Sequence, residues 1–389
     1  MDEPLLANVK AKIQAILPEI KRLRHQIHQT PEIGLATRET RQTIAQALAG
    51  TSLTIHPPLL ENDLIAELQR PVGKTICLRA DTDALPVQET TQLDYTSCNP
   101  GAMHACGHDG HTVILIGTAL VLEAFREQLP VSVRFVFQPG EEVVGGGKTL
   151  VRLGACGTAV EAYALHNWPG LPVGQVATRT GPLFAAGVMF DIQITGRGCH
   201  GAMPEQGHNP IPVAATIVTK LHELHREVNQ RDGSVVSVCS VLAGDSQNII
   251  PDTAVIRGTT RYLNTASGLE IERALLQIVE STAVSAGITI TLDYPKIYDL
   301  PLINTELGVN RIAAVARQVL PAGQWQLQTN PQMVCEDFAF YLENRDGALF
   351  LLGAGTDGPR LHNPNFDFND EILEIGILMM SLLALNHPG

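Results

Sequence analysis

Apolar side chains recur at spacings of three and four residues through the first part of the chain. The recurring positions are Leu6, Val9, Ile13, Ile16, Ile20, Leu23 and Ile27. A helix with about 3.6 residues per turn places such positions on one face. We therefore expect an amphipathic helix over this segment, which Pro18 is able to kink because it lacks a backbone donor.

Short continuous apolar runs follow, and they predict buried strands. Four of these runs, at 76–80, 131–137, 162–165 and 348–352, lead to polar side chains. Helical patterns alternate with the strand-like runs to about Thr180, which is typical of an α/β layer structure.

One expected helix begins next to the stretch that is richest in metal-binding side chains. We expect Asp109 to cap it, and the helix to extend toward Gln128 and to end before Pro130. Such a cap would fix the preceding loop at a helix N-terminus.

The pattern changes after Gly181-Pro182, where a different order of elements is expected. A strand at 188–195 and a helix at 210–228 are followed by strands at 235–242 and 254–262, a helix at 269–286 and a strand at 288–292. This order matches a split βαβ module with an antiparallel sheet and two helices on one face. Strand and helix patterns with polar side chains continue after it, so we expect the module to be an insertion.

The stretch from Met103 to His111 concentrates metal-binding chemistry. It holds one thiol and three imidazoles within nine residues, and its neighbouring side chains are small. Deprotonated Cys and neutral His bind zinc-like ions, and Cys106 and His108 can direct both donors toward one site. The alternative is a polar loop that contains one buried thiol.

Further donors follow the other predicted strands. Glu141 and Glu142 come after 131–137, His166 follows 162–165, and His362 comes after 348–352. One of two adjacent carboxylates can bind a cation while the other moves a proton, as metal-assisted hydrolysis requires. Ligands of open α/β sheets bind outside the carboxyl ends of the strands, so one topology would gather these side chains. Taken singly, each is more often a solvated acid or a structural histidine.

Five ordered motifs resemble the aminoacylase and hippuricase-type metal amidohydrolases, which include auxin-conjugate hydrolases and some carboxypeptidases. The motifs are Asp81-x-Asp83-Ala84-Leu85-Pro86, the stretch 103–111, Gln138-Pro139-x-Glu141-Glu142, Leu165-His166-Asn167 and His362-Asn363-Pro364-x-Phe366. The resemblance covers nearly the whole chain. It implies a metallopeptidase-like fold with an α/β catalytic domain, whose central sheet is mostly parallel and flanked by helices, and an inserted satellite domain for dimerisation. The expected bounds are 1–184 and 298–389 for the catalytic domain and 185–297 for the insertion.

The resemblance also implies a site for two divalent metal ions. Its ligands would be Cys106, His108, Glu142, His166 and His362, with Cys106 as the bridging ligand. Glu141 is implied as the general base, and Asp83 would orient a ligand and tune its basicity. The role of Asp81 stays open. This donor set suits zinc, manganese, nickel or cobalt, so the metal is not specified.

The resemblance extends to the inserted domain. His200 resembles a family histidine that reaches an active site, often that of a partner subunit, and stabilises the oxyanion. Its alternative is packing within its own loop. Asn248 and Arg261 are candidates for binding the substrate carboxylate. Glu205 stands where the family usually has a histidine, which leaves the substrate assignment open.

Composition favours a soluble, cytoplasmic enzyme. The chain has 389 residues, which exceeds the size at which one core stops growing, and its net charge of -13 argues against nucleic acid and anionic membranes as partners. Seven cysteines without a Cys-x-x-Cys pair favour a reducing compartment. No apolar stretch is long enough to span a bilayer, and the first residues lack a signal core.

The sequence therefore predicts a metal-dependent amidohydrolase that cleaves small-molecule N-acyl amino acids and forms a homodimer or a higher homo-oligomer. One alternative is a carboxypeptidase or dipeptidase that acts on blocked short peptides. Another is a non-catalytic protein that retains the metal and binds amino acids. The presence of Glu141 argues against the second alternative, because a binding protein would not need a general base.

Overall fold

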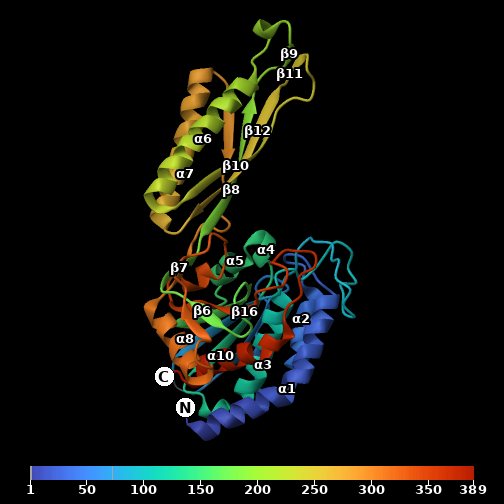
Figure 1. The fold of residues 1–389 in the computed structure, drawn as a ribbon, viewed down its shortest axis with the longest axis vertical. Coiled ribbons are helices and arrows are strands. Elements are labelled where there is room, and N and C mark those ends of the chain that lie inside the picture. Colours follow the sequence, from blue (N-terminus) through green and yellow to red (C-terminus); the bar gives the residue numbers. More distant parts are fainter. Residues whose placement is uncertain (1, 72) are drawn as a thin grey trace. The chain divides into compact units, whose positions relative to one another are not determined.

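The computed structural model of the chain describes residues 2–71 and 73–389, which form two compact units (Figure 1). Unit 1 comprises Met1–Leu183, Ile303–Asn330 and Asp337–Gly389, and unit 2 comprises Phe184–Leu302 and Pro331–Glu336. The chain passes between them within β7 (Gly181–Phe184), within β14 (Leu302–Asn304) and at both ends of the 331–336 segment. Unit 2 is thus inserted into the sequence of unit 1.

The sheet of unit 1 contains eight strands among the described residues. They are β1 (Thr54–Ile55), β2 (Leu64–Leu68), β3 (Thr75–Asp81), β4 (Ser132–Gln138), β5 (Glu161–Pro169), β6 (Val176–Thr178), β15 (Trp325–Leu327) and β16 (Asp346–Gly355). Their order across the sheet is β1-β2-β4-β3-β5-β16-β6-β15. The central pairs β4–β3, β3–β5 and β5–β16 are parallel, whereas β1–β2, β2–β4 and β6–β16 are antiparallel.

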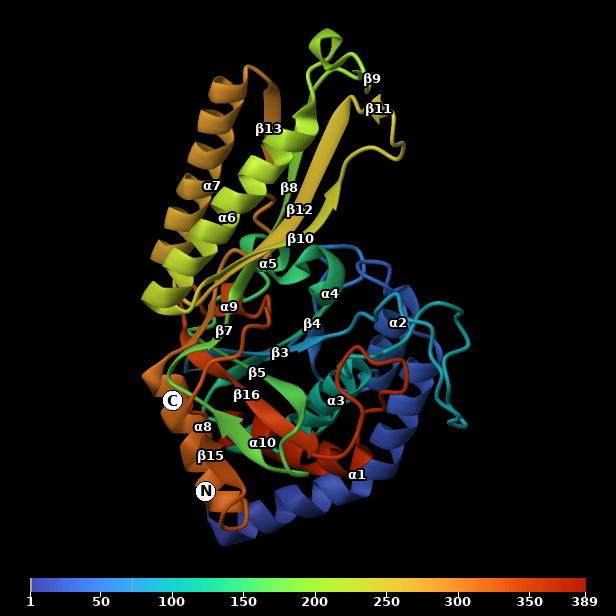
Figure 2. The same cartoon turned by 45° about the horizontal axis from the view of Figure 1, so that its top comes forward.

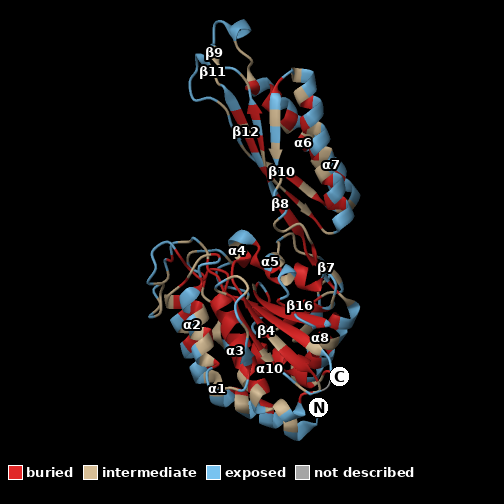
Figure 3. Cartoon of the chain, turned by 180° about the vertical axis from the view of Figure 1, so that it is seen from behind, coloured by how far each residue is buried: buried red, intermediate tan, exposed pale blue. Residues whose placement is uncertain are grey.

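The central strands overlap the apolar runs that the sequence marked, and this prediction is confirmed. Their side chains are buried almost without interruption, as expected for parallel strands covered on both faces (Figure 3). The register places Leu351 of β16 opposite His166 of β5. Because these strands run in the same direction, their carboxyl ends and the loops that follow lie at one edge of the sheet.

Helices lie on both sides of this sheet (Figure 2). They are α1 (Glu3–Gln29), α2 (Arg38–Ala47), α3 (His108–Ala124), η1 (Arg126–Gln128), α4 (Glu141–Val144), α5 (Gly146–Arg152), α8 (Glu306–Val319), α9 (Ala339–Leu342), η3 (Asp370–Ile372) and α10 (Leu373–Leu385). α1, α3 and α10 contact one another on one side, whereas α5 and α9 contact each other on the other. α1 is continuous with Pro18 inside it, and its expected apolar face supplies the buried residues Val9, Ile13, Ile20, Leu23 and Ile27.

α3 and α10 approach closely at two glycines. A Cβ atom on Gly117 would lie 2.6 Å from Cδ1 of Ile377, and one on Gly376 would lie 2.6 Å from Cδ1 of Ile114. The glycine of each helix thus leaves room for an isoleucine of the other helix. This reciprocal packing fixes α3, whose first residue is His108.

The expectation that Asp109 caps α3 is wrong. The helix begins after Gly107, whose φ of 86° lies in the left-handed region that favours glycine, and no side chain caps it. Asp109 is buried in the first turn instead, where its carboxylate accepts hydrogen bonds from Arg24 and His28. Burial next to a cationic side chain outweighs the local capping preference of Asp.

Unit 2 has a four-stranded antiparallel sheet and two long helices. The strands are β8 (Ala186–Thr195), β10 (Val235–Leu242), β12 (Thr253–Tyr262) and β13 (Thr289–Asp293), in the order β10-β12-β8-β13. The helices α6 (Pro210–Asp232) and α7 (Thr265–Ala286) contact each other and the sheet, and each ends at a left-handed glycine. The predicted order of strands and helices is confirmed.

Three short elements in unit 2 were not predicted. β9 (Cys199–His200) pairs with β11 (Ile249–Ile250), and η2 (Pro204–Gln206) lies between β9 and α6. Two-residue strands carry too little periodicity to be recognised in a sequence.

Candidate metal centre

The carboxyl ends of the parallel strands and the segments that follow them bring six of the expected residues together. Cys106, His108 and His166 place one ligand atom each within 4.8 Å of the other two, and so do Cys106, Glu142 and His362. A third group within the same limit consists of His108, Glu141 and Glu142. These overlapping groups share members, so they form one cluster of sulfur, nitrogen and oxygen donors.

Local structure presents the acidic pair to this cluster. The four-residue helix α4 begins with Glu141 and Glu142 and lies between Gly140 and Gly145, whose φ angles are 77° and 63°. Asp83 accepts a hydrogen bond from the backbone of Glu141 on Oδ1 at 2.9 Å and from that of Glu142 on Oδ2 at 3.1 Å. The Asp83 carboxylate therefore fixes the start of α4 and the direction of both glutamates.

Hydrogen bonds orient the two buried histidines. Nδ1 of His108 lies 2.9 Å from the carbonyl oxygen of Asp83, and Nδ1 of His166 lies 2.7 Å from that of Asn167. A carbonyl can only accept, so both Nδ1 atoms carry a proton and both Nε2 atoms are left for the cluster. The Nε2 atom of His166 lies 3.5 Å from Sγ of Cys106.

His362 completes the cluster from the loop after β16. Its Nε2 atom lies 3.4 Å from Oε1 of Glu142, and its backbone donates to the carbonyl of Ala105 at 2.8 Å. The backbone φ of His362 is 66°, a conformation that side-chain-bearing residues adopt rarely and at an energetic cost. The surrounding loop holds this conformation and keeps the imidazole next to Glu142.

Two buried atoms in the cluster suit a cation. Within the described part of the chain, Nε2 of His108 and Oε1 of Glu142 are buried and have no hydrogen-bond partner. They lie 3.7 Å apart. Buried polar atoms without a partner are costly, and a metal ion accepts electron pairs from both. The donor set of thiol, imidazoles and carboxylates fits the expected divalent ions.

The electrostatics of the cluster also favour positive charge. Burial raises the pKa of the Cys106 thiol, and the nearby carboxylates of Glu142 and Glu141 raise it further. Burial lowers the pKa of His108, but Asp81 and the adjacent acids outweigh this effect and raise it to about 10. Without metal, a proton on His108 therefore balances part of the charge of these carboxylates. A bound metal cation would balance the same charge in place of that proton.

Asp81 and His111 form a neighbouring pair whose geometry the sequence did not reveal. Nδ1 of His111 lies 2.6 Å from Oδ1 of Asp81, and Nε2 of His111 accepts from the backbone N–H of Asn167 at 3.0 Å. Both ring nitrogens of His111 are thus hydrogen-bonded within the protein. The three imidazoles in 103–111 look alike in the sequence, and only these contacts separate His108 from His111.

The expected residues of unit 2 lie in two places within that unit. His200 is in β9 and Asn248 directly precedes β11, and the backbone of Gly201 donates to the Asn248 carbonyl at 2.8 Å. Arg261 is near the other end of β12 and donates to the Cys335 thiol. His200 and Asn248 are therefore neighbours, whereas Arg261 is separated from them by most of a ten-residue strand.

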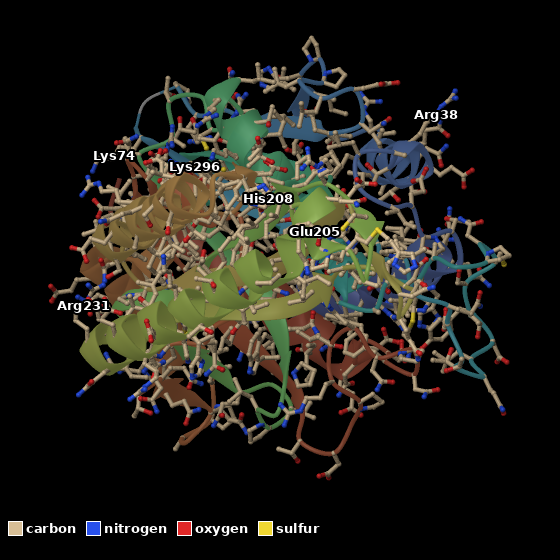
Figure 4. The ribbon with its side chains drawn as sticks, turned by 90° about the horizontal axis from the view of Figure 1, so that it is seen from above. Arg38, Lys74, Glu205, His208, Arg231 and Lys296 are labelled. Atoms are coloured by element: carbon tan, nitrogen blue, oxygen red, sulfur yellow. The ribbon has the colours of Figure 1, made fainter. Side chains whose placement is uncertain are left out.

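The loop after β9 carries the departure from the family pattern. Glu205 and His208, both labelled in Figure 4, come from the segment between β9 and α6. Glu205 is in η2, and the backbone of His208 pairs with that of Arg197.

Comparison with known proteins identifies the family. Residues 77–386 match Peptidase family M20/M25/M40. The chain belongs to this family. M20 enzymes hydrolyse amide bonds with bound metal, so the chain is a metal-dependent amidohydrolase, and the predicted family and two-domain α/β class are confirmed.

Individual relatives match the M20 chain over almost its whole length. It is 33% identical to an N-acetylcysteine deacetylase of Bacillus subtilis (strain 168), over 93% of this chain and 95% of the relative. It is 31% identical to the IAA-amino acid hydrolase ILR1-like 4 of Arabidopsis thaliana, over 94% and 84%. A crystal structure of a dinuclear metal-binding M20 peptidase from Bacillus subtilis has a TM-score of 0.82 and 31% identity, and the match covers 96% of this chain and 98% of that one.

The described residues contain no helix with the length and apolar character needed to cross a membrane.

Proposed function

We propose that this M20 enzyme hydrolyses the amide bond of N-acyl amino acids and releases an acid and a free amino acid. The observation that carries the proposal is the position of Glu141, whose carboxylate lies within 4.8 Å of ligand atoms of His108 and Glu142. Two of the similar proteins have names that describe hydrolysis of N-acyl amino acids, a deacetylase and an IAA-amino acid hydrolase. Their similarity covers most of the chain, which supports the same substrate class here.

The cluster would hold two divalent ions. The proposed ligands are Cys106, His108, Glu142, His166 and His362, and Cys106 would be shared by the two ions, since it belongs both to the group with His108 and His166 and to the group with Glu142 and His362. Zinc, manganese, nickel and cobalt all suit this set, since it mixes soft sulfur with nitrogen and oxygen. Bound in pairs, such ions lower the pKa of water and polarise the amide carbonyl.

The protein's own groups would carry the proton transfers. Glu141 would accept a proton from the attacking water and deliver it to the departing amine. Asp83 would support this role by holding the backbone of Glu141 and Glu142 through its two carboxylate oxygens. A shift of either glutamate would misplace the general base relative to the carbonyl carbon.

Unit 2 would supply groups for the substrate. We assign stabilisation of the oxyanion to His200, acting in the site of a partner subunit of a homodimer or larger homo-oligomer. Either Asn248, which is a neighbour of His200, or Arg261, near the far end of β12, would bind the substrate carboxylate, for which a guanidinium offers two parallel hydrogen bonds. The seven cysteines are all free thiols, which is compatible with a cytoplasmic location.

A carboxypeptidase or dipeptidase acting on blocked short peptides is the second candidate. The chemistry at the metals would be the same, and only the group on the acyl side would differ. Rates on N-acetyl, N-benzoyl and indole-acetyl amino acids, compared with blocked dipeptides, separate the two. Higher kcat/KM on the dipeptides would favour the second candidate.

The variant Glu141→Gln tests the mechanism. It should retain the bound metal and lose nearly all turnover, because an amide cannot accept the proton. Glu127→Gln, which changes a side chain that is 76% exposed in the same unit, is the matched control and should keep full activity. Normal hydrolysis by Glu141→Gln would exclude the proposed general base. Loss of metal in that variant would instead assign Glu141 to the ligands.

A further inference from the structure

A fully buried arginine lies behind the metal centre. Nη1 of Arg24, on α1, lies 3.1 Å from Oδ2 of Asp109 and 3.1 Å from Oδ1 of Asp367. Its Nε lies 2.5 Å from Oδ1 of Asp370. The Arg24 side chain has no exposed surface, and its single positive charge is shared by one buried and two partly buried carboxylates.

These carboxylates belong to the two segments that carry proposed metal ligands. Asp109 directly follows His108 in the first turn of α3. Asp367 comes five residues after His362 in the same loop, and Asp370 comes eight residues after it as the first residue of η3. Arg24 thus connects the 103–111 loop to the 362–370 loop although it coordinates nothing itself.

A third segment is held by the same cluster. The ring of Tyr95 lies 4.8 Å from Cζ of Arg24, and its hydroxyl donates to Asp367 at 2.8 Å. The backbone of Thr90 donates to the carbonyl of Pro364 at 2.9 Å, two residues after His362. The 90–95 segment therefore covers the group formed by Arg24, Asp109, Asp367 and Asp370. It also restrains the His362 loop.

Only an arginine fits these contacts. Its planar fork reaches Asp109 and Asp367 through Nη1 and Asp370 through Nε, whereas a lysine has one nitrogen at the end of its chain. If the cation were removed, Asp109 would keep His28 and Asp370 would keep Lys21 and His25, but the three carboxylates would lose the one cation that they share. Their repulsion would act directly between the two ligand-bearing segments.

We infer that Arg24 is a positioning residue for the metal centre, and that it sets the affinity of the ion held by Cys106, Glu142 and His362. This inference rests on the proposed ligand assignment. His362 is the ligand most dependent on Arg24, because its loop is on the surface and its side chain is 53% exposed. His108 and His166 are buried in other segments and retain their own hydrogen bonds.

Equilibrium dialysis against manganese ions, with metal content measured by elemental analysis, tests the inference. The wild type should bind two ions per chain. Arg24→Met and Arg24→Lys should weaken the binding of one of the two ions by about tenfold or more, since loss of groups that orient ligands has effects of this size. Turnover of the variants should recover at saturating manganese, because the general base and both ligand sets are still present.

The control is Arg311→Met, which removes an ion pair of 2.7 Å with Glu161, the first residue of β5, five residues before His166. It should lower the melting temperature and leave both manganese affinities unchanged. Asp367→Asn keeps the side-chain shape, removes one partner of Arg24 and should weaken the same ion if Arg24→Met does not fold.

Three outcomes separate the inference from the proposed function. Two ions bound with wild-type affinity in the Arg24 and Asp367 variants would overturn the positioning role alone, as would an equal loss in Arg311→Met. Fewer than two ions in the wild type would contradict the proposed metal centre, and the positioning role with it.

Discussion

Replacing Asp83 by Asn is expected to lower kcat/KM without unfolding the enzyme. In the wild type, the two carboxylate oxygens accept the backbone N–H groups of Glu141 and Glu142 at 2.9 and 3.1 Å. Asn offers one acceptor oxygen, and its amino group would face the other N–H. One buried donor therefore loses its acceptor at the start of the helix that holds Glu141, the proposed general base.

The structure gives the size of the effect. A buried N–H without a partner costs about 1–3 kcal/mol. If the loop moves to relieve this cost, Glu141 or Glu142 moves with it, and each ~1.4 kcal/mol lost from the transition state lowers the rate tenfold. We expect kcat/KM for an N-acyl amino acid to fall by about tenfold to a hundredfold, with a weaker effect on metal content.

Asp63→Asn is the matched control. Asp63 is also buried in unit 1, and its Oδ1 accepts the backbone N–H groups of Leu59 and Leu60 at 2.8 and 2.5 Å. Its substitution keeps Oδ1 as the acceptor of both N–H groups and should leave kcat/KM unchanged. Wild-type kinetics in Asp83→Asn, or an equal loss of activity in Asp63→Asn, would refute the link between Asp83 and the general base.

Three further predictions concern stability and assembly. Gly117→Ala should lower the free energy of unfolding by about 1–3 kcal/mol in urea titrations, because its Cβ would meet Ile377; an unchanged value would contradict the close helix packing. Burial raises the pKa of Glu161, but hydrogen bonds from His387 and Arg311 outweigh it and lower the pKa from 4.5 to about 2. The stability from this carboxylate is therefore present above pH 4.5 and lost as the pH falls toward 2. Melting curves of Glu161→Gln should show a smaller loss over that range, and an identical pH dependence would contradict the assignment. Mixed His200→Ala and Glu141→Gln enzymes should regain part of the activity, and no recovery would place His200 outside the partner's site.

The sequence predicted the elements that local patterns specify. Continuous apolar runs marked the central strands, and the alternating order of elements marked the βαββαβ module of unit 2. The polar residues after the strands lie together because parallel strands bring their carboxyl ends to one edge. The sequence did not predict Gly107 as the N-cap residue of α3, because a left-handed glycine before a helix leaves no strong pattern.

Sequence patterns could not predict the contacts between segments that are distant along the chain. Arg24 appears in the sequence as one of several charged residues in an amphipathic helix, and nothing local indicates that it is buried. Its partners Asp109 and Asp367 are 85 and 343 positions away. The hydrogen bonds that distinguish His108 from His111 likewise depend on Asp83 and Asn167, which belong to other strand ends.

Anomalous X-ray diffraction at the absorption edge of the bound metal tests the metal centre most directly. Crystals of the purified enzyme should show two metal peaks per chain, with Sγ of Cys106 bound to both. His108 and His166 should bind one ion through Nε2, and His362 and Glu142 should contact the other. A single peak, or two peaks that both lack Cys106 as a ligand, would contradict the shared two-metal site.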